Sequence, residues 1–163
     1  MKRTMTPRAH AAVRKELHEL KAQRPEIARA IEIARGHGDL SENGDYDAAK
    51  DRSGMVEAKI RECEGLLASA EIVDPKNIVD PQKVTFGVTV KIEDVDSGEQ
   101  KTLSIYGSEE SDISKGWISY ESPLGMALIG KEVGETFVAN LPGGKKEYEI
   151  LDIYVDYDWN GED

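Results

Sequence analysis

The sequence predicts an α+β protein in which an antiparallel helical hairpin, or coiled coil, is followed by a small antiparallel sheet domain with one short helix. Two observations predict this class. Apolar residues recur with heptad spacing through the first 75 residues, and beyond Pro75 they alternate with polar residues in short runs. Heptad spacing is typical of helices that pack on each other, whereas alternation is typical of strands with one buried face.

Two heptad rows define the helices of the hairpin. The first row is Val13, Leu17, Leu20, Arg24, Ile27, Ile31 and Ala34, and the second is Tyr46, Ala49, Ser53, Val56, Ile60, Cys63, Leu67 and Ala70. A glycine-rich stretch separates them, and each glycine costs a helix roughly 1 kcal/mol relative to alanine. An antiparallel hairpin lets each row bury the other. Pro25 cannot donate a backbone hydrogen bond, so we expect a kink or break near residues 21–24.

Short alternating segments in the second half predict strands. These segments are residues 86–92, 103–105, 117–120, 136–141 and 147–155. Ser122 followed by Pro123 predicts the start of the short helix, because serine caps helices and proline suits the first helical position. Gly130 then closes that helix.

These patterns predict a domain organisation with a linker and a tail. The predicted parts are a hairpin domain at residues 1–75, a linker at 76–82, a sheet domain at 83–157 and an acidic tail at 158–163. We expect the chain from Asp156 onward to be frayed, because polar chain ends seldom have packing partners.

Composition and charge limit the possible function classes. No apolar run approaches the roughly 20 residues of a membrane span, and the N-terminus has no apolar signal region, so we expect a cytoplasmic protein. Cys63 is the only cysteine, which excludes an internal disulfide and a cysteine metal cluster. The net charge of -11 argues against a general nucleic-acid binder. Residues 1–35 nevertheless carry 9 basic and 4 acidic side chains, which favours directed docking.

Carboxylates are concentrated between the two heptad rows, at the expected end of the hairpin. The stretch is Gly38-Asp39-Leu40-Ser41-Glu42-Asn43-Gly44-Asp45. Asp39 and Glu42 are three residues apart, and Asp45 repeats that spacing, so a turn or helix would place all three on one side. Carboxylate oxygens suit a hard cation such as Mg²⁺, although one hairpin end offers only part of a coordination shell.

The residues of this stretch alone leave several interpretations open. Asp39 and Glu42 are compatible with a shared metal site, with a capping box in which Asp39 caps the second helix, or with a solvated acidic loop. His37 is either a ligand or a solvated histidine at a helix end. Lys50 and Arg52 are either surface residues or cations for RNA phosphate.

Residues 37–50 closely resemble the tip signature of the bacterial Gre transcript-cleavage factors. The second half is similar to the C-terminal domain of that family, an FKBP-like sheet. The segments that carry this likeness are Ser122-Pro123-Leu124-Gly125-Met126-Ala127-Leu128-Ile129-Gly130-Lys131 and Leu141-Pro142-Gly143-Gly144. The resemblance extends from Thr6 to Val155. Ala48-Ala49-Lys50 and the overall charge balance favour the GreA branch over the GreB branch, although Gly44-Asp45 stands where many relatives have Ala-Glu.

The resemblance implies a transcription elongation factor that binds RNA polymerase at the mouth of its secondary channel through the C-terminal domain. The coiled coil would enter the channel. Asp39 and Glu42 would act there as accessory catalytic carboxylates that complete an Mg²⁺ site shared with the polymerase. The tip would be supported by Ser41, Asn43, Asp45 and Tyr46, and the contacts to RNA or polymerase would be made by Lys50 and Arg52.

The resemblance also implies that the polymerase itself performs the reaction. It would cleave the 3′ end of backtracked nascent RNA and so rescue arrested complexes. The protein would then be an accessory factor rather than an enzyme, would bind no cofactor alone, and would act as a monomer without a membrane partner.

Two other function classes are compatible with this architecture. A peptidyl-prolyl isomerase or holdase chaperone could combine an FKBP-like sheet with a helical hairpin, but an isomerase pocket needs aromatic lining and the second half has few aromatic residues. An inhibitor of the polymerase could share the whole fold. Because Asp39 and Glu42 are both present, the sequence favours cleavage stimulation.

Overall fold

The computed structural model describes residues 2–38 and 43–161. Internal contacts divide the chain into two compact units, one formed by His10–Ala70 and the other by Lys2–Ala9 together with Glu71–Asp163. The first unit is helical and the second contains the main sheet, so the predicted α+β class is confirmed. Residues 2–9, which the sequence analysis assigns to the hairpin domain, pack with the sheet.

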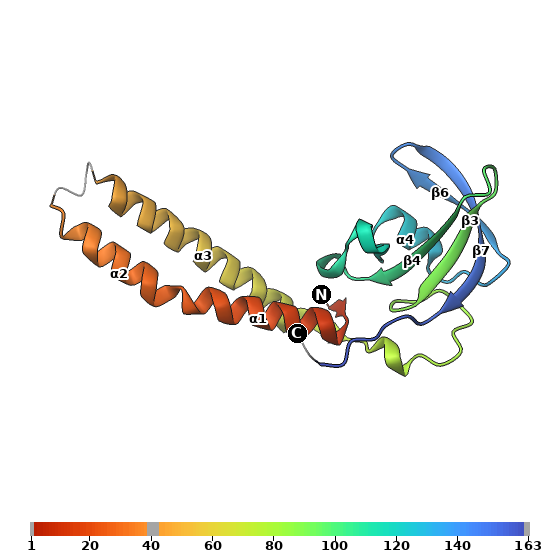
Figure 1. Ribbon diagram of the computed structural model, residues 1–163, viewed down its shortest axis with the longest axis horizontal. Helices are drawn as coiled ribbons and strands as arrows, with labels where there is room; N and C mark the ends of the chain where they lie inside the picture. Colours follow the sequence, from red (N-terminus) through yellow and green to blue (C-terminus); the bar gives the residue numbers. More distant parts are fainter. Residues whose placement is uncertain (1, 39–42, 162–163) are drawn as a thin grey trace. The chain divides into compact units, whose positions relative to one another are not determined.

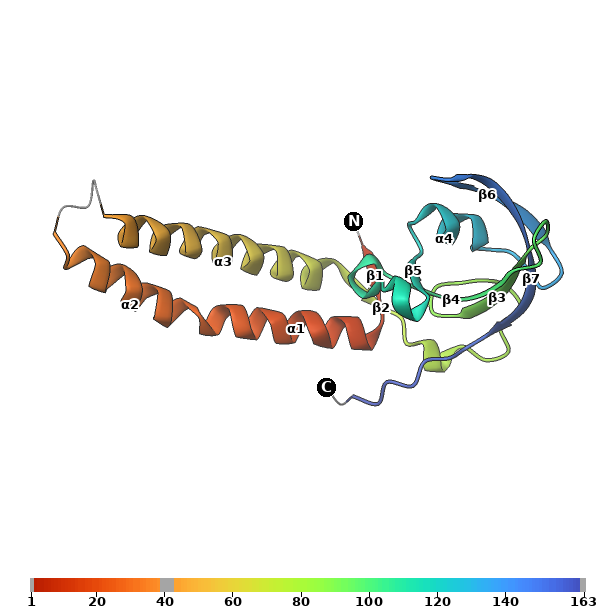
Figure 2. The same cartoon turned by 45° about the horizontal axis from the view of Figure 1, so that its top comes forward.

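The helices of the hairpin are α1 (Pro7–Ala22), α2 (Arg24–Arg35) and α3 (Gly44–Ser69). Helix α3 runs back alongside the other two, as both views show (Figure 1, Figure 2). The predicted break near Pro25 is confirmed at Gln23, which separates α1 from α2. Gln23 keeps helical angles, with φ −78° and ψ −17°, so the chain passes from one helix into the next without an extended linker.

The heptad rows form the buried faces of the hairpin, as predicted. The buried members are Val13, Leu20, Ile27 and Ala34 in the first row and Ala49, Val56, Ile60 and Cys63 in the second. The four buried residues of the first row lie seven positions apart along the chain, which is the repeat of a coiled coil. Arg24, the polar member of that row, is exposed and donates two hydrogen bonds to Glu57, at 2.9 and 2.8 Å. Hydrogen bonding from Arg24 lowers the pKa of the Glu57 carboxyl.

The second unit contains a five-stranded sheet with the strand order β5-β4-β3-β7-β6. Its strands are β3 (Thr89–Asp94), β4 (Gln100–Tyr106), β5 (Trp117–Ser119), β6 (Thr136–Leu141) and β7 (Gly144–Tyr154). Neighbouring strands are antiparallel except β5, which pairs with β4 in parallel. The register places Val90 opposite both Leu103 and Ile153, so apolar side chains from three strands meet on one face.

One short helix covers that apolar face. Helix α4 (Pro123–Leu128) starts as predicted, because the Ser122 hydroxyl accepts a hydrogen bond from the Gly125 amide at 3.1 Å. Figure 2 shows the sheet curving around this helix, and Leu128 is fully buried in the core. Short 3-10 helices at Pro75–Asn77, Ser108–Glu110 and Ile113–Lys115 complete the unit. A further two-stranded sheet, β1 (Arg3–Met5) with β2 (Ala70–Ile72), was not predicted by the sequence.

Two predicted segments differ from the structure. The strand expected from residue 86 begins only at Thr89, because Phe86 and Gly87 form a turn in which Gly87 has a φ of 96°. The tail expected to fray from Asp156 is anchored by Tyr157, whose side chain is 7% exposed. Within residues 2–38 and 43–161, no helix combines the length and apolar character that a membrane span requires.

Candidate functional site

The candidate site is the end of the hairpin, where α2 stops and α3 begins. Helix α2 ends in overlapping turns, with the amide of His37 donating to the Ala34 carbonyl at 3.1 Å and that of Gly38 donating to the Arg35 carbonyl at 3.4 Å. Gly38 has a φ of 103°, a conformation that residues with a side chain rarely adopt. Helix α2 thus ends at Arg35, and the positive φ of Gly38 keeps the turns that follow from continuing the helix.

Asn43 joins the two helices at the hairpin end. Its side-chain oxygen accepts a hydrogen bond from the Tyr46 amide at 3.0 Å, which caps α3. Its side-chain nitrogen donates to the Ala34 carbonyl of α2 at 2.5 Å. Asn43 is 9% exposed; its hydrogen bond to the Ala34 carbonyl is buried, and the one from the Tyr46 amide is partly buried. One asparagine side chain therefore both caps α3 and links it to the last turn of α2.

This geometry corrects the capping interpretation of Asp39. The residue before the first turn of α3 is Asn43, and its side chain occupies the cap position that the sequence analysis considered for Asp39. Asp39, Leu40, Ser41 and Glu42 lie outside the described residues. The assignment of Asp39 and Glu42 as accessory carboxylates, and of Ser41 as a supporting residue, therefore stays a prediction.

Asp45 and Tyr46 occupy the first turn of α3. The Asp45 side chain is 81% exposed, and its carboxylate lies 3.8 Å from Nδ1 of His37. Asp47 adds a second carboxylate to the same turn, where the positive end of the helix dipole favours anions. Carboxylate oxygens fit a hard cation such as Mg²⁺, but among the residues described no three potential ligands converge on one point. The described part of the hairpin end could therefore supply only part of a metal site.

The two predicted cationic contact residues lie farther along α3. The Lys50 ammonium is 5.4 Å from the centroid of the Tyr46 ring, within reach of a cation–π interaction. The Arg52 guanidinium lies 3.8 Å from the carboxylate of Glu26, in α2. It also donates a 3.5 Å hydrogen bond to the side-chain oxygen of Gln23, at the break before α2. Sequence reasoning did not find these partners, because they depend on which residues of the two helices face each other.

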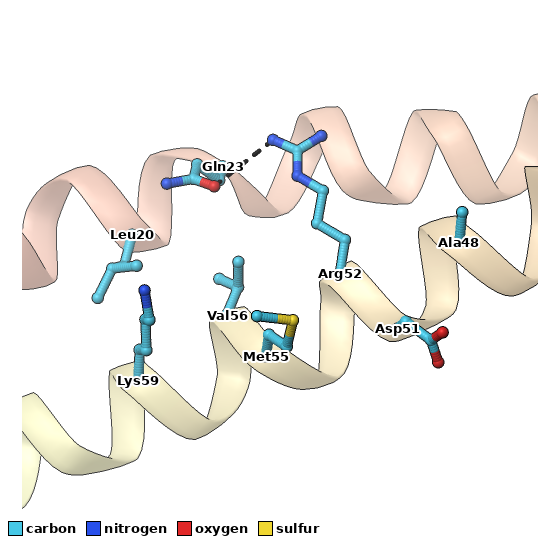
Figure 3. Close-up of a pocket in the computed structure, with 8 residues that line it drawn as sticks. All are labelled: Leu20, Gln23, Ala48, Asp51, Arg52, Met55, Val56 and Lys59. Atoms are coloured by element: carbon cyan, nitrogen blue, oxygen red, sulfur yellow. Dashed lines mark hydrogen bonds between the residues drawn. The ribbon is translucent and has the colours of Figure 1, made fainter.

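Arg52 also borders a shallow groove of about 430 Å³ where α1 gives way to α2. Figure 3 shows its side chain reaching from α3 toward Gln23, with Leu20 and Val56 forming part of the apolar floor. The groove is lined by Leu20, Gln23, Ala48, Asp51, Arg52, Met55, Val56 and Lys59. Because Met55 is 65% exposed, this part of the hairpin presents apolar surface beside two cations.

The fold combines a helical hairpin, whose end carries carboxylates, with a curled mixed sheet. Comparison with known protein families identifies the class of protein that has this architecture. Residues 3–72 match a family model described as "Transcription elongation factor, N-terminal". Residues 79–155 match "Transcription elongation factor, GreA/GreB, C-term". The chain therefore belongs to the GreA/GreB family of transcription elongation factors.

Individual relatives agree with this assignment. The chain is 46% identical over 150 residues to transcription elongation factor GreA of Verminephrobacter eiseniae, covering 91% of this chain and 95% of the relative. It is 48% identical over 143 residues to GreA of Maridesulfovibrio salexigens, covering 88% and 89% of the two chains. Among solved structures, GreA factor homolog 1 of Thermus thermophilus is similar with a TM-score of 0.43 and 24% identity, over 94% of this chain and 99% of that chain. The predicted resemblance, GreA-like more than GreB-like, is confirmed.

Proposed function

We propose that this elongation factor binds RNA polymerase and stimulates the polymerase's own Mg²⁺-dependent cleavage of the 3′ end of backtracked nascent RNA. The helical hairpin enters the secondary channel, and the second unit binds at the mouth of that channel. The product of the reaction is a shortened RNA from which elongation resumes. Membership of the GreA/GreB family supports the role in elongation.

The observation that carries this proposal is the closure of the hairpin end by Asn43. Its hydrogen bonds to α2 and α3 leave a short connection between the helices, and that connection contains Asp39 and Glu42 in the sequence. A closed end supports delivery of these two carboxylates as a unit, since the helices behind them are tied together. Asp45 and Asp47 add negative charge in the first turn of α3.

The roles of the individual residues follow from their chemistry. Asp39 and Glu42 supply oxygen ligands and orient the attacking water, and Mg²⁺ shared with the polymerase supplies Lewis-acid activation of that water. Asn43, together with Ser41, Asp45 and Tyr46, supports the tip. Lys50 and Arg52 neutralise phosphate charge on the RNA or contact the polymerase.

The protein acts in this scheme as a monomeric accessory factor in the cytoplasm. A hairpin end with two or three carboxylates forms an incomplete metal site, so the remaining ligands come from the polymerase and the RNA. The protein alone therefore hydrolyses no RNA.

The test is a cleavage assay on stalled, backtracked polymerase complexes carrying RNA labelled at its 5′ end. We expect the unaltered protein to shorten the RNA, and Asp39→Ala and Glu42→Gln to lose at least about 100-fold in rate while binding is retained. Asp51→Asn is the charge-matched control, because it removes one carboxylate from α3 outside the connection. Normal cleavage by Asp39→Ala would refute the role of the tip. Slowed RNA synthesis without shortening would instead identify an inhibitor.

A further inference from the structure

The start of helix α1 is capped by residues from both halves of the chain. The Thr6 hydroxyl accepts a hydrogen bond from the Ala9 amide at 3.1 Å, the usual geometry of a helix cap. Pro7 has no amide hydrogen to satisfy. The next amide, that of Arg8, donates at 3.1 Å to the hydroxyl of Tyr157, which follows strand β7. The tail thus supplies a hydrogen-bond acceptor that the first turn of α1 would otherwise lack.

The Arg8 side chain is enclosed by the same part of the second unit. Its Nε donates to the Glu110 carboxylate at 2.7 Å, and only 20% of the side chain is exposed. The guanidinium carbon lies 4.1 Å from the ring centroid of Trp117, 4.8 Å from that of Tyr157 and 5.2 Å from that of Tyr106. A cation surrounded by three aromatic rings and paired with a carboxylate is held more firmly than an exposed ion pair.

A second hydrogen bond to Glu110 extends this arrangement. The Thr6 hydroxyl donates to the other Glu110 oxygen at 2.7 Å, so one carboxylate binds both the cap residue and Arg8. The rings of Tyr106 and Tyr157 lie 6.3 Å apart at 62°, an edge-to-face contact. Burial raises the pKa of Tyr157 above its ordinary value, which is already well above physiological pH, so its hydroxyl is neutral.

We propose that Arg8 and Tyr157 form a latch that holds the start of α1 on the second unit, and that this latch positions the hairpin for transcript cleavage. The second part of the proposal rests on the proposed function. Helix α1 is continuous from Pro7 to Ala22, so its first turn belongs to the second unit and its remainder to the hairpin. With the latch open, β1 would still hold residues 3–5 through its pairing with β2, but the first turn of α1 would lose its side-chain contacts to the second unit.

The latch itself is tested by amide hydrogen exchange in the full chain, without polymerase. Tyr157→Phe keeps the ring and removes the acceptor for the Arg8 amide, so we expect exchange at Arg8 to become about tenfold faster. Tyr157→Ala and Arg8→Lys should increase exchange at residues 6–9 further. Tyr154→Phe is the control, because it removes a hydroxyl from a nearby tyrosine that is 36% exposed. Unchanged exchange in both Tyr157 variants would overturn the latch.

The positioning role is tested by cleavage assays at a series of factor concentrations. We expect Tyr157→Ala to lower the maximal cleavage rate at least threefold while the concentration for half-maximal effect changes less than twofold, because the sheet remains folded. Arg8→Lys should restore more activity than Arg8→Ala, since the ammonium keeps the cation–aromatic contacts. If exchange increases but the maximal rate is unchanged, the positioning role is wrong. If the unaltered protein stimulates no cleavage, the proposed function fails, while the exchange data still decide whether the latch exists.

Discussion

Replacing Asn43 with alanine should loosen the hairpin end without unfolding the hairpin. The substitution removes the cap of α3, which contributes about 1 kcal/mol. It also removes the buried hydrogen bond to the Ala34 carbonyl, which contributes about another 1 kcal/mol. The Ala34 carbonyl keeps one partner, because the His37 amide also donates to it. The expected loss is therefore about 2 kcal/mol, equivalent to a roughly 30-fold increase in local opening.

Hydrogen exchange at the Tyr46 amide measures this opening directly. The matched variant is Asn43→Asp, which keeps the acceptor for Tyr46 and loses the donor to Ala34. We expect it to show the smaller effect, since a carboxylate is a good helix cap. If Asn43→Ala exchanges at Tyr46 no faster than the unaltered protein, the bridging role derived for this residue is wrong. If both variants increase exchange at Tyr46 equally, the hydrogen bond from Asn43 to the Ala34 carbonyl accounts for the whole stabilising effect of this side chain.

Two further substitutions test the second unit. Gly125→Ala would force its Cβ into the Ser119 carbonyl oxygen, so we expect the free energy of unfolding measured in denaturant to fall by at least about 2 kcal/mol. Gly65→Ala, with nothing within 4 Å, should be neutral or stabilising. Asp94→Asn should lower the melting temperature at pH 7. The melting temperature of this variant should also decrease less than that of the unaltered protein as the pH is lowered. Hydrogen bonds led by the Ser97 amide lower the pKa of Asp94, so its contribution is complete above an unfolded pKa of about 3.9 and is lost as the pH falls through the lower folded value. If the melting temperature decreases equally in both proteins as the pH is lowered, Asp94 does not contribute to stability in this way.

The helical hairpin is the part of the fold that its sequence describes most directly. Heptad spacing is a local property, and the residues that it selects, such as Leu20 and Ile60, are buried as predicted. The break near Pro25 follows from a missing amide hydrogen and needs no tertiary information. The start of β3 was predicted less well, because the alternation through Phe86 continues past a turn that the positive φ of Gly87 creates.

The contacts of the candidate site depend on groups that sequence spacing does not bring together. The link from Asn43 to the Ala34 carbonyl crosses from one helix to the other, and its acceptor is a backbone atom that carries no sequence signal. Tyr157 was assigned to a frayed end because its neighbours are acidic, whereas its partner Arg8 lies at the other end of the chain. Thr6 followed by Pro7 is a local sequence signal for the start of α1, because threonine caps helices and proline suits the first helical position. It carries no information about Tyr157.

The division of the chain also has a consequence for how the protein folds during synthesis. The second unit contains Lys2–Ala9 and Glu71–Asp163, so the hairpin is an insertion within it. The hairpin needs only contacts between segments close in sequence, which form early as the chain leaves the ribosome. Residues 2–9 must instead wait for Tyr157, which is synthesised after the whole hairpin. We therefore expect residues 2–9, although they are synthesised before the hairpin, to find their native partners after it has formed.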